Sequence, residues 1–191
     1  MVEYVELHCH SYFSLLDGAS SPEALVARAA VLGYPALALT DHNGLYGAVR
    51  FWQAAREHGI KAIVGAEVSL VPPGSHPGER TQGGRRMEGG ARGTPRGAVP
   101  EGGHLTLLAM DRRGYANLCR LISAGQLAGQ KGQPSLTLDA VAVRSAGLIC
   151  LSGCRRGPVP GALLAGDGAG ARQIAGRLRD LFGPERFWIE I

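Results

Sequence analysis

The 191-residue sequence lacks long hydrophobic runs and contains few aromatic residues. No stretch approaches the ~20 consecutive apolar residues that a membrane-spanning helix requires, so we expect no membrane partner. The N-terminal residues MVEYVELHCH carry acidic side chains and lack the apolar core of a signal peptide, which predicts a cytoplasmic protein. Aromatic residues make up only 6% of the chain, so its core must consist mainly of Leu, Val, Ala and Ile.

The sequence also contains few cysteines, and its basic residues are scattered. The four cysteines form no C-x-x-C pair, and in a reducing compartment they do not predict a disulfide framework. We expect Cys9, Cys119 and Cys150 to pack in the core. The net charge of +4 is modest and no segment carries a dense basic run, so charge alone identifies no partner.

The remaining composition is typical of one folded domain. Apolar residues make up 45% of the chain and charged residues 19%, which indicates a sizeable core. Short apolar runs alternate with amphipathic segments, a pattern typical of repeated β–α units in a parallel sheet. Strands are expected over residues 2–8, 36–40, 61–70, 104–110, 147–152 and 186–191. Helices are expected over 20–32, 46–58, 113–124, 138–143 and 169–182, with Gly125 ending the third.

The alternation is interrupted once. Residues 72–103 contain five Pro, ten Gly and five Arg and almost no apolar side chain, which predicts a flexible surface insertion. The sequence stops at the last expected strand, whereas a β/α barrel needs further strands to close. We therefore expect these residues to be part of a longer protein.

His8-Cys9-His10 stands where the first expected strand ends. Alternation along a strand places His8 and His10 on one side and Cys9 on the other. Two imidazoles spaced in this way can share a metal ion or bind two neighbouring ones. Taken alone, such a pair more often marks ordinary surface or core histidines.

Further polar residues recur near the ends of the other expected strands. In β/α architectures the loops that follow the strands gather at one rim, where active sites are built. Imidazole, carboxylate and thiolate ligands would meet there, a set that suits zinc, manganese or iron. His104 fits this argument least well, because it opens its strand. The candidate metal ligands are His8, His10, Asp17, His42, Glu67, His104 and Cys154.

Several neighbouring residues allow two interpretations. Asp41 could orient His42 as a hydrogen-bond acceptor, or it could cap the turn before Gly44. Cys154 is either a thiolate ligand or a small core residue. The pair Arg155-Arg156 could bind a phosphate at the rim, although a solvated pair is the more common role for such residues.

Five blocks of the sequence resemble one known family. ELHCHSYFSLLDGAS, ALALTDHNGLYG, GAEVSL, HLTLLAMD and LSGC are similar to the PHP (polymerase and histidinol phosphatase) domain. They most resemble its version at the N-terminus of the bacterial C-family DNA polymerase III alpha subunit, especially the error-prone subclass. The resemblance implies an α/β fold, a distorted (β/α)7 barrel, with residues 1–191 as an incomplete N-terminal domain.

The resemblance also implies a metal cluster and an activity. The family uses nine ligands for up to three ions, Mn or Zn, and seven of them fall on the candidates above. The other two belong to an Asp-x-His motif that these residues lack, which implies little activity for them alone. The implied whole protein is a DNA-directed DNA polymerase of replication and translesion repair, which binds DNA.

The PHP domain itself would be a metal-dependent phosphoesterase with 3′–5′ exonuclease proofreading. Two alternatives remain. The domain could be a non-catalytic module that binds metal for stability and docks on the remainder of the polymerase chain. It could also be a free-standing phosphatase that acts on a small ester.

Overall fold

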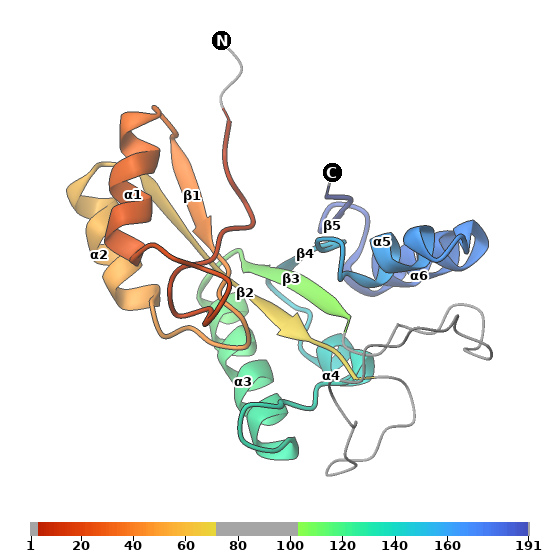
Figure 1. Ribbon diagram of the computed structural model, residues 1–191. Helices are drawn as coiled ribbons and strands as arrows, with labels where there is room; N and C mark the ends of the chain where they lie inside the picture. Colours follow the sequence, from red (N-terminus) through yellow and green to blue (C-terminus); the bar gives the residue numbers. More distant parts are fainter. Residues whose placement is uncertain (1–3, 72–102, 191) are drawn as a thin grey trace.

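The computed structural model describes residues 4–71 and 103–190, and its centre is a single mixed sheet (Figure 1). The strands follow one another across the sheet in chain order. β3 runs antiparallel to both of its neighbours, whereas the outer pairs, β1 with β2 and β4 with β5, are parallel. The strands are β1 (Ala36–Leu39), β2 (Lys61–Ser69), β3 (His104–Ala109), β4 (Leu148–Leu151) and β5 (Phe187–Trp188).

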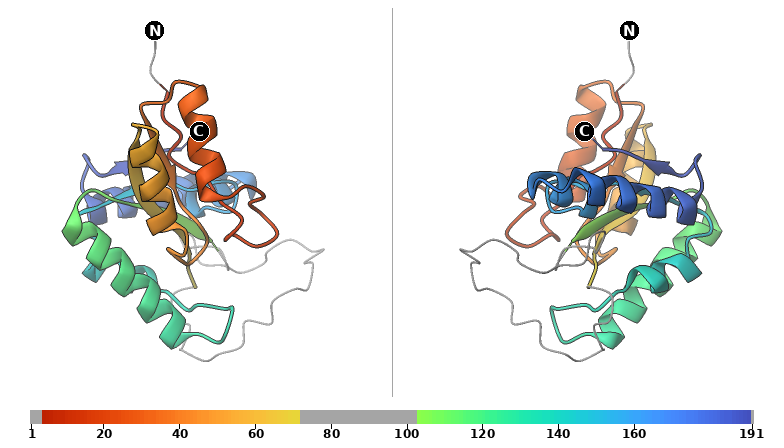
Figure 2. Two further views of the ribbon diagram at one scale, coloured as in Figure 1. Left: turned by 90° about the vertical axis from the view of Figure 1, so that its left-hand side faces the viewer. Right: turned by 90° about the vertical axis from the view of Figure 1, so that its right-hand side faces the viewer.

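Six helices in the described residues cover one face of this sheet. Helices α1 and α2 pack together at the β1 end, α3 lies against β2, β3 and β4, and α5 and α6 lie side by side near β4 and β5 (Figure 2). The helices are α1 (Pro22–Val31), α2 (Ala48–Glu57), α3 (Arg112–Ala128), α4 (Leu138–Val143), α5 (Pro158–Leu164) and α6 (Gly168–Phe182). None of them is both long enough and apolar enough to span a bilayer. The α/β class predicted from the sequence is confirmed, and the strand order is that of a partial α/β barrel.

The pattern along the strands separates the two faces of the sheet. Leu105 and Leu107 of β3 point into the main core between sheet and helices, together with Leu118 and Leu121 of α3. Alternate residues point to the opposite face, where Leu108 of β3 packs against Ala38 of β1 and Leu151 of β4. Period-two alternation therefore provides a helix-covered face and a second, less covered face on which polar groups can gather.

Two expectations about the strands are wrong. Residues 2–8 were expected as a strand, but the described part of this segment forms only one parallel bridge, Glu6 to Leu37. Two backbone hydrogen bonds still join the segment to the chain at β1, from Ala38 N–H to the Glu6 carbonyl and from Thr40 N–H to the Cys9 carbonyl, and the Thr40 hydroxyl bonds both the N–H and the carbonyl of Cys9. A uniformly parallel sheet was also expected, and β3 is antiparallel.

Gly125 does not end the third helix. It lies inside α3, where it is buried against Leu136 and Pro134. Helix α5 was not predicted, because its sequence PVPGALL contains two Pro and a Gly. Pro158 is nevertheless compatible with the first helical position, where its missing N–H costs nothing.

The expected flexible insertion at 72–103 lies outside the described residues, apart from Gly103. Its two ends are adjacent in space, because Ser69 at the end of β2 pairs with His104 at the start of β3. The Leu70 N–H also donates to the Gly103 carbonyl at 2.8 Å. A short turn is therefore sufficient to connect the two strands.

Replacement of residues 73–102 by a short Gly/Ser linker should leave the melting temperature within a few degrees of the parent chain. The physical reason is that the β2–β3 pairing, and not the intervening residues, brings the strand ends together. Thermal unfolding followed by circular dichroism measures this. Loss of the cooperative transition in the shortened chain would show that residues 73–102 contribute to the core.

Candidate metal centre

Glu67 lies at the buried end of the candidate metal centre, which is called its floor. It lies on β2 between Ala66 and Val68, which point into the main core, so its own side chain points to the opposite face. The side chain is only 1% exposed. An ionised carboxylate removed from water in this way is costly unless cationic or hydrogen-bonding partners surround it.

Four imidazoles supply those partners. The His8 Nε2 atom lies 2.5 Å from Oε2 of Glu67, and the His10 Nε2 atom lies 3.5 Å from the same oxygen. On the other carboxylate oxygen, Oε1, converge Nδ1 of His42 at 3.2 Å and Nδ1 of His104. Residues separated by almost one hundred positions in the sequence thus meet at one carboxylate.

The antiparallel direction of β3 explains why His104 belongs to this group. The first residue of β3 pairs with Ser69, near the end of β2, and Glu67 pairs with Thr106. The start of an antiparallel strand lies at the same edge of the sheet as the end of its neighbour. His104 therefore joins the rim although it opens its strand.

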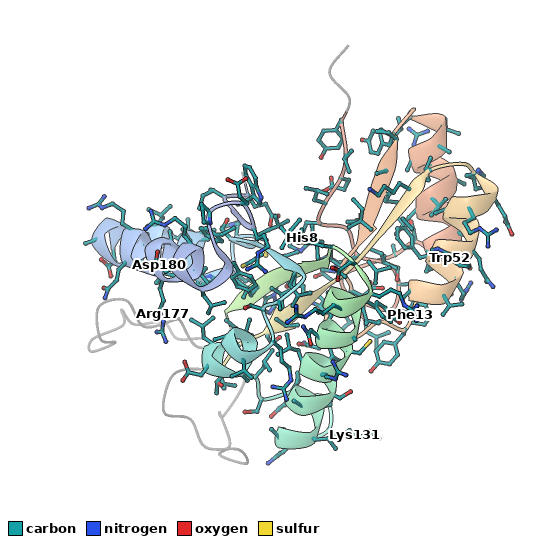
Figure 3. The ribbon with its side chains drawn as sticks, turned by 180° about the vertical axis from the view of Figure 1, so that it is seen from behind. His8, Phe13, Trp52, Lys131, Arg177 and Asp180 are labelled. Atoms are coloured by element: carbon teal, nitrogen blue, oxygen red, sulfur yellow. The ribbon has the colours of Figure 1, made fainter. Side chains whose placement is uncertain are left out.

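His8 is held from both sides. Its Nδ1 atom lies 2.7 Å from Oε1 of Glu190, beyond β5, while its Nε2 faces Glu67. The segment that carries His8, which is labelled in Figure 3, borders β1 at one edge of the sheet, and Glu190 follows the other edge strand. The sheet therefore curves enough for this contact to join its two edges. Because carboxylates only accept hydrogen bonds, His8 is doubly protonated between them, and a metal ion on Nε2 would replace the second proton.

Asp17 and His42 form the outer part of the site. The His42 Nε2 atom lies 2.8 Å from Oδ2 of Asp17, which belongs to the loop before α1. The Asp17 side chain is 52% exposed, in contrast to the buried Glu67. The cluster therefore runs from a buried floor to an open mouth.

Asp41 holds the loop that carries Asp17. Its carboxylate accepts hydrogen bonds from the N–H and the hydroxyl of Ser11 and from the hydroxyl of Ser14, each at 2.7 Å. Neither interpretation drawn from the sequence, orientation of His42 or a cap before Gly44, describes this role. Asp41 is 2% exposed, so these bonds also satisfy a buried charge.

Ser14 connects the Asp41 carboxylate to two candidate ligands, His10 and His42. Its oxygen accepts the backbone N–H of His42 at 3.1 Å and lies 3.2 Å from Nδ1 of His10. Since the Ser14 hydroxyl donates to Asp41, Nδ1 of His10 must carry the proton that faces it, which leaves Nε2 of His10 free for a metal ion. Asn43 adds a second support, because its side chain bonds the N–H and the hydroxyl of Ser69.

The charge on Glu67 and the charges on the surrounding histidines stabilise one another. Burial alone would raise the pKa of the Glu67 carboxyl, but the surrounding imidazoles hold it far below its usual range. Burial opposes a charge on His8, yet the carboxylates of Glu190 and Glu67 outweigh it and raise the His8 pKa to about 10. Hydrogen bonding to Glu67 is the largest cause of a raised pKa at His42. Positive charge is thus favoured beside the buried carboxylate, and a divalent cation supplies it.

The donor atoms form three overlapping sets, each able to hold an ion. Within each set the donor atoms lie within 4.8 Å of one another, and the sets share His10, His42 and Glu67. Oε1 of Glu67 and Nδ1 of His104 are buried and face each other without a regular hydrogen bond, as expected for two atoms that bind the same cation. Nitrogen and oxygen donors of this kind suit zinc, manganese and iron. The sets are His8, His10 and Glu67; His10, Asp17 and His42; and His42, Glu67 and His104.

The structure thus brings together six of the seven candidates. Cys154 is the exception, because its sulfur belongs to none of the three sets. It lies in the turn after β4, and the same turn binds the strand that carries His104 through a bond from the His104 N–H to the Arg156 carbonyl at 2.9 Å. Cys154 is therefore near the centre along the backbone and is partly exposed. Cys150 is buried and Cys9 packs beside the α1–α2 core, as expected, whereas Cys119 is only partly buried.

Sequence reasoning missed Glu190, Ser14 and Asn43. Glu190 follows the short strand β5 at the same sheet edge as the other candidates, so the strand-end rule could have suggested it. No comparable signal exists for Ser14 and Asn43, because their roles depend on contacts between separate loops. The small residue Gly18 contributes in a similar way, since a side chain there would collide with the Ser11 carbonyl.

Comparison with known proteins identifies the class. The PHP domain family matches residues 6–191, so the chain belongs to that family, as the resemblance predicted. Within it, an error-prone DNA polymerase from Mycobacterium bovis is 44% identical over 192 residues. The DNA polymerase III subunit alpha of Treponema pallidum is 38% identical over 190 residues. The alignments cover 100% of this chain but only 16% and 15% of these relatives.

Solved structures align more loosely. An amidohydrolase from Chromobacterium violaceum matches with a TM-score of 0.46 and 17% identity, over 97% of this chain and 84% of that chain. A two-domain protein from Bacteroides vulgatus, described as containing a predicted PHP-like metal-dependent phosphoesterase, matches with a TM-score of 0.45 and 18% identity. This second alignment covers 77% of this chain and 33% of that chain.

Replacement of Asp41 by Asn should lower the free energy of unfolding by about 2 kcal/mol. The variant keeps the size of the side chain but loses the charge that accepts three hydrogen bonds, and such bonds are stronger than neutral ones. Urea denaturation measures the change. The matched control, Asp180→Asn on exposed α6, should stay within about 0.5 kcal/mol. Equal stability of the two variants would contradict the role of Asp41.

Proposed function

We propose that the chain is a metal-dependent phosphoester hydrolase domain whose cluster holds two to three divalent ions, Mn or Zn, with Fe as the alternative. The observation that carries the proposal is the exposure of one side of the cluster to solvent. Structural metal sites are closed by protein ligands, whereas catalytic sites keep a position open to water and substrate. Here the floor at Glu67 is buried and the Asp17 side of the cluster faces solvent.

Two groups of residues in this chain would hold the ions. Glu67, His8 and His104 would hold metal at the enclosed floor, and His10, His42 and Asp17 would hold it at the mouth. Divalent ions there supply Lewis acids for phosphoryl oxygens and lower the pKa of bound water. Glu190 and Ser14 would fix the orientation of His8 and His10 by bonding their Nδ1 atoms.

We further propose that the domain belongs to an error-prone DNA polymerase that acts in DNA replication and translesion repair in the cytoplasm. DNA and the rest of the polymerase chain would be its partners, and a 3′ end would be the substrate of a 3′–5′ exonuclease. The support is the 44% identity over the whole of this chain. Because the chain spans 16% of that relative, nucleotidyl transfer is a proposal for the whole protein.

Metal binding is the most direct test. Two of the nine ligands that the family resemblance implies are not among these residues, so hydrolysis by the chain alone is expected to be slow. A non-catalytic module would bind metal as well, but it would show no metal-dependent release of nucleotides from a labelled 3′ end when the full ligand set is present.

Added Mn²⁺ or Zn²⁺ should raise the melting temperature of the chain. Binding only to the folded state at 100 times Kd stabilises a protein by about 2.7 kcal/mol. For a domain of this size, that corresponds to a rise of roughly 5–10 °C. The double variant His8→Ala/His10→Ala should lose the rise and most of the bound metal, measured by calorimetry and elemental analysis.

The control for this experiment is His58→Ala, which removes an imidazole at the C-terminal end of α2, away from the cluster. It should keep both the metal and the temperature rise. Folded wild-type protein that takes up only traces of any transition metal would refute the metal cluster.

We propose, from the family pattern, that Cys154 is also a ligand. A metal-bound thiolate reacts slowly, so saturating Zn²⁺ should reduce the rate of Cys154 alkylation by iodoacetamide at least tenfold, measured by peptide mass spectrometry. Cys119, on α3 and also partly exposed, serves as the internal control and should react at an unchanged rate. Equal rates at Cys154 with and without metal would remove it from the ligand set.

A further inference from the structure

One aromatic side chain in the loop after the ligand His42 is exposed and also has packing neighbours. Tyr46 follows His42 by four residues, in the loop that leads into α2, and is 67% exposed. Its ring lies directly over Gly44, where any side chain would collide with the ring. A large apolar surface presented to water in a fixed position is typical of a binding surface.

Tyr46 also has an aromatic neighbour. Its ring centroid lies 6.2 Å from that of Phe13, with an interplanar angle of 40°. Phe13 belongs to the loop between the ligands His10 and Asp17 and packs in turn on Tyr12, with centroids 4.8 Å apart. Tyr46 therefore lies beside residues of both loops that carry the outer ligands, Gly44 after His42 and Phe13 after His10.

A cationic side chain is carried by a turn next to the ligand His104. The carbonyl of Arg156 accepts the N–H of His104 at 2.9 Å, which joins the turn after β4 to the start of β3. Both Arg155 and Arg156 are exposed. Among the described residues, the arginines that form ion pairs with carboxylates are Arg50, Arg177 and Arg179.

The turn that carries Arg156 is tightly packed. Gly157 donates its N–H to the Cys154 carbonyl at 2.6 Å, and a side chain at Gly153 would approach the His104 carbonyl to 2.8 Å. The backbone at Arg156 is thus fixed to the β3 strand that carries His104, while the guanidinium extends into solvent.

We propose that Tyr46 is a stacking platform for a base of single-stranded nucleic acid and that Arg156 binds a neighbouring phosphate, both at the mouth of the metal centre. The inference rests on the proposed phosphoester hydrolysis and specifies its substrate as a strand with an unpaired base. An aromatic face beside a cationic groove is the combination by which proteins bind single strands without reading sequence. A small phosphomonoester would engage the arginine but leave the tyrosine unused.

Binding of two labelled strands to the 191-residue chain tests the proposal. One is oligothymidylate and the other is an abasic strand of equal length, both with phosphorothioate linkages to prevent hydrolysis, followed by fluorescence anisotropy with Mn²⁺ present. Tyr46→Ala should weaken binding of oligothymidylate about tenfold and leave the abasic strand unaffected, because stacking needs a base. Tyr46→Phe should retain wild-type affinity.

Arg156→Ala should weaken both strands equally and reduce the slope of log affinity against log salt by about 0.7, the loss of one phosphate contact. Arg156→Lys should preserve the slope. Two controls match these changes elsewhere on the surface: Trp52→Ala removes an exposed aromatic ring of α2, and Arg177→Ala removes an exposed guanidinium of α6. Neither should change the affinity for either strand.

Three results would overturn the proposal: no measurable binding of oligothymidylate by folded wild-type protein, wild-type affinity in Tyr46→Ala, or an equal loss on both strands in that variant. The second result is expected if a protein segment, and not a base, covers Tyr46. Metal content measured on the same samples separates the two proposals. Metal uptake without Tyr46-dependent binding refutes only this inference, whereas Tyr46-dependent binding without metal uptake refutes only the hydrolase.

Discussion

The structure depends on the charge of one buried side chain. Glu67 lies in the middle of the mixed sheet, flanked along β2 by residues of the main core, and an unpaired carboxylate there would oppose folding by several kcal/mol. The chain compensates with four imidazoles from separate segments. Protons on those imidazoles and divalent cations satisfy the same need, so binding of a cation here would be linked to folding of the sheet.

Local rules were sufficient to predict much of the fold and the site. The strand-end rule selected Glu67 and His42, because their positions depend only on where each strand stops. It also selected His8 and His10, although the segment before them forms a single bridge and not the expected strand. His104 seemed the weakest candidate only because a parallel sheet was assumed. Once β3 is antiparallel, the same rule places its first residue at the rim.

The remaining features could not be predicted because they depend on contacts between distant segments. Asp41 stands beside His42 in the sequence, yet its carboxylate binds the loop at Ser11 and Ser14, about thirty residues away. Glu190 meets His8 only because the sheet curves. Gly125 indicates a helix end by composition, but it lies inside α3, where it packs against Leu136. In each case tertiary packing outweighs the local preference.

The way the ligand loop is attached explains how the centre combines rigidity with access. Asp41 fixes the base of the loop through buried hydrogen bonds. Ser14, which donates to Asp41, also bonds the His10 ring and the His42 backbone and so restrains both residues. Asp17, farther along the same loop, remains half in solvent and is restrained mainly through its contact with His42. Order thus decreases from the floor outward, so an ion at the floor would exchange slowly while one at the mouth stays accessible to water and to a phosphate. A site buried on all sides would gain stability, but no phosphoester could reach it.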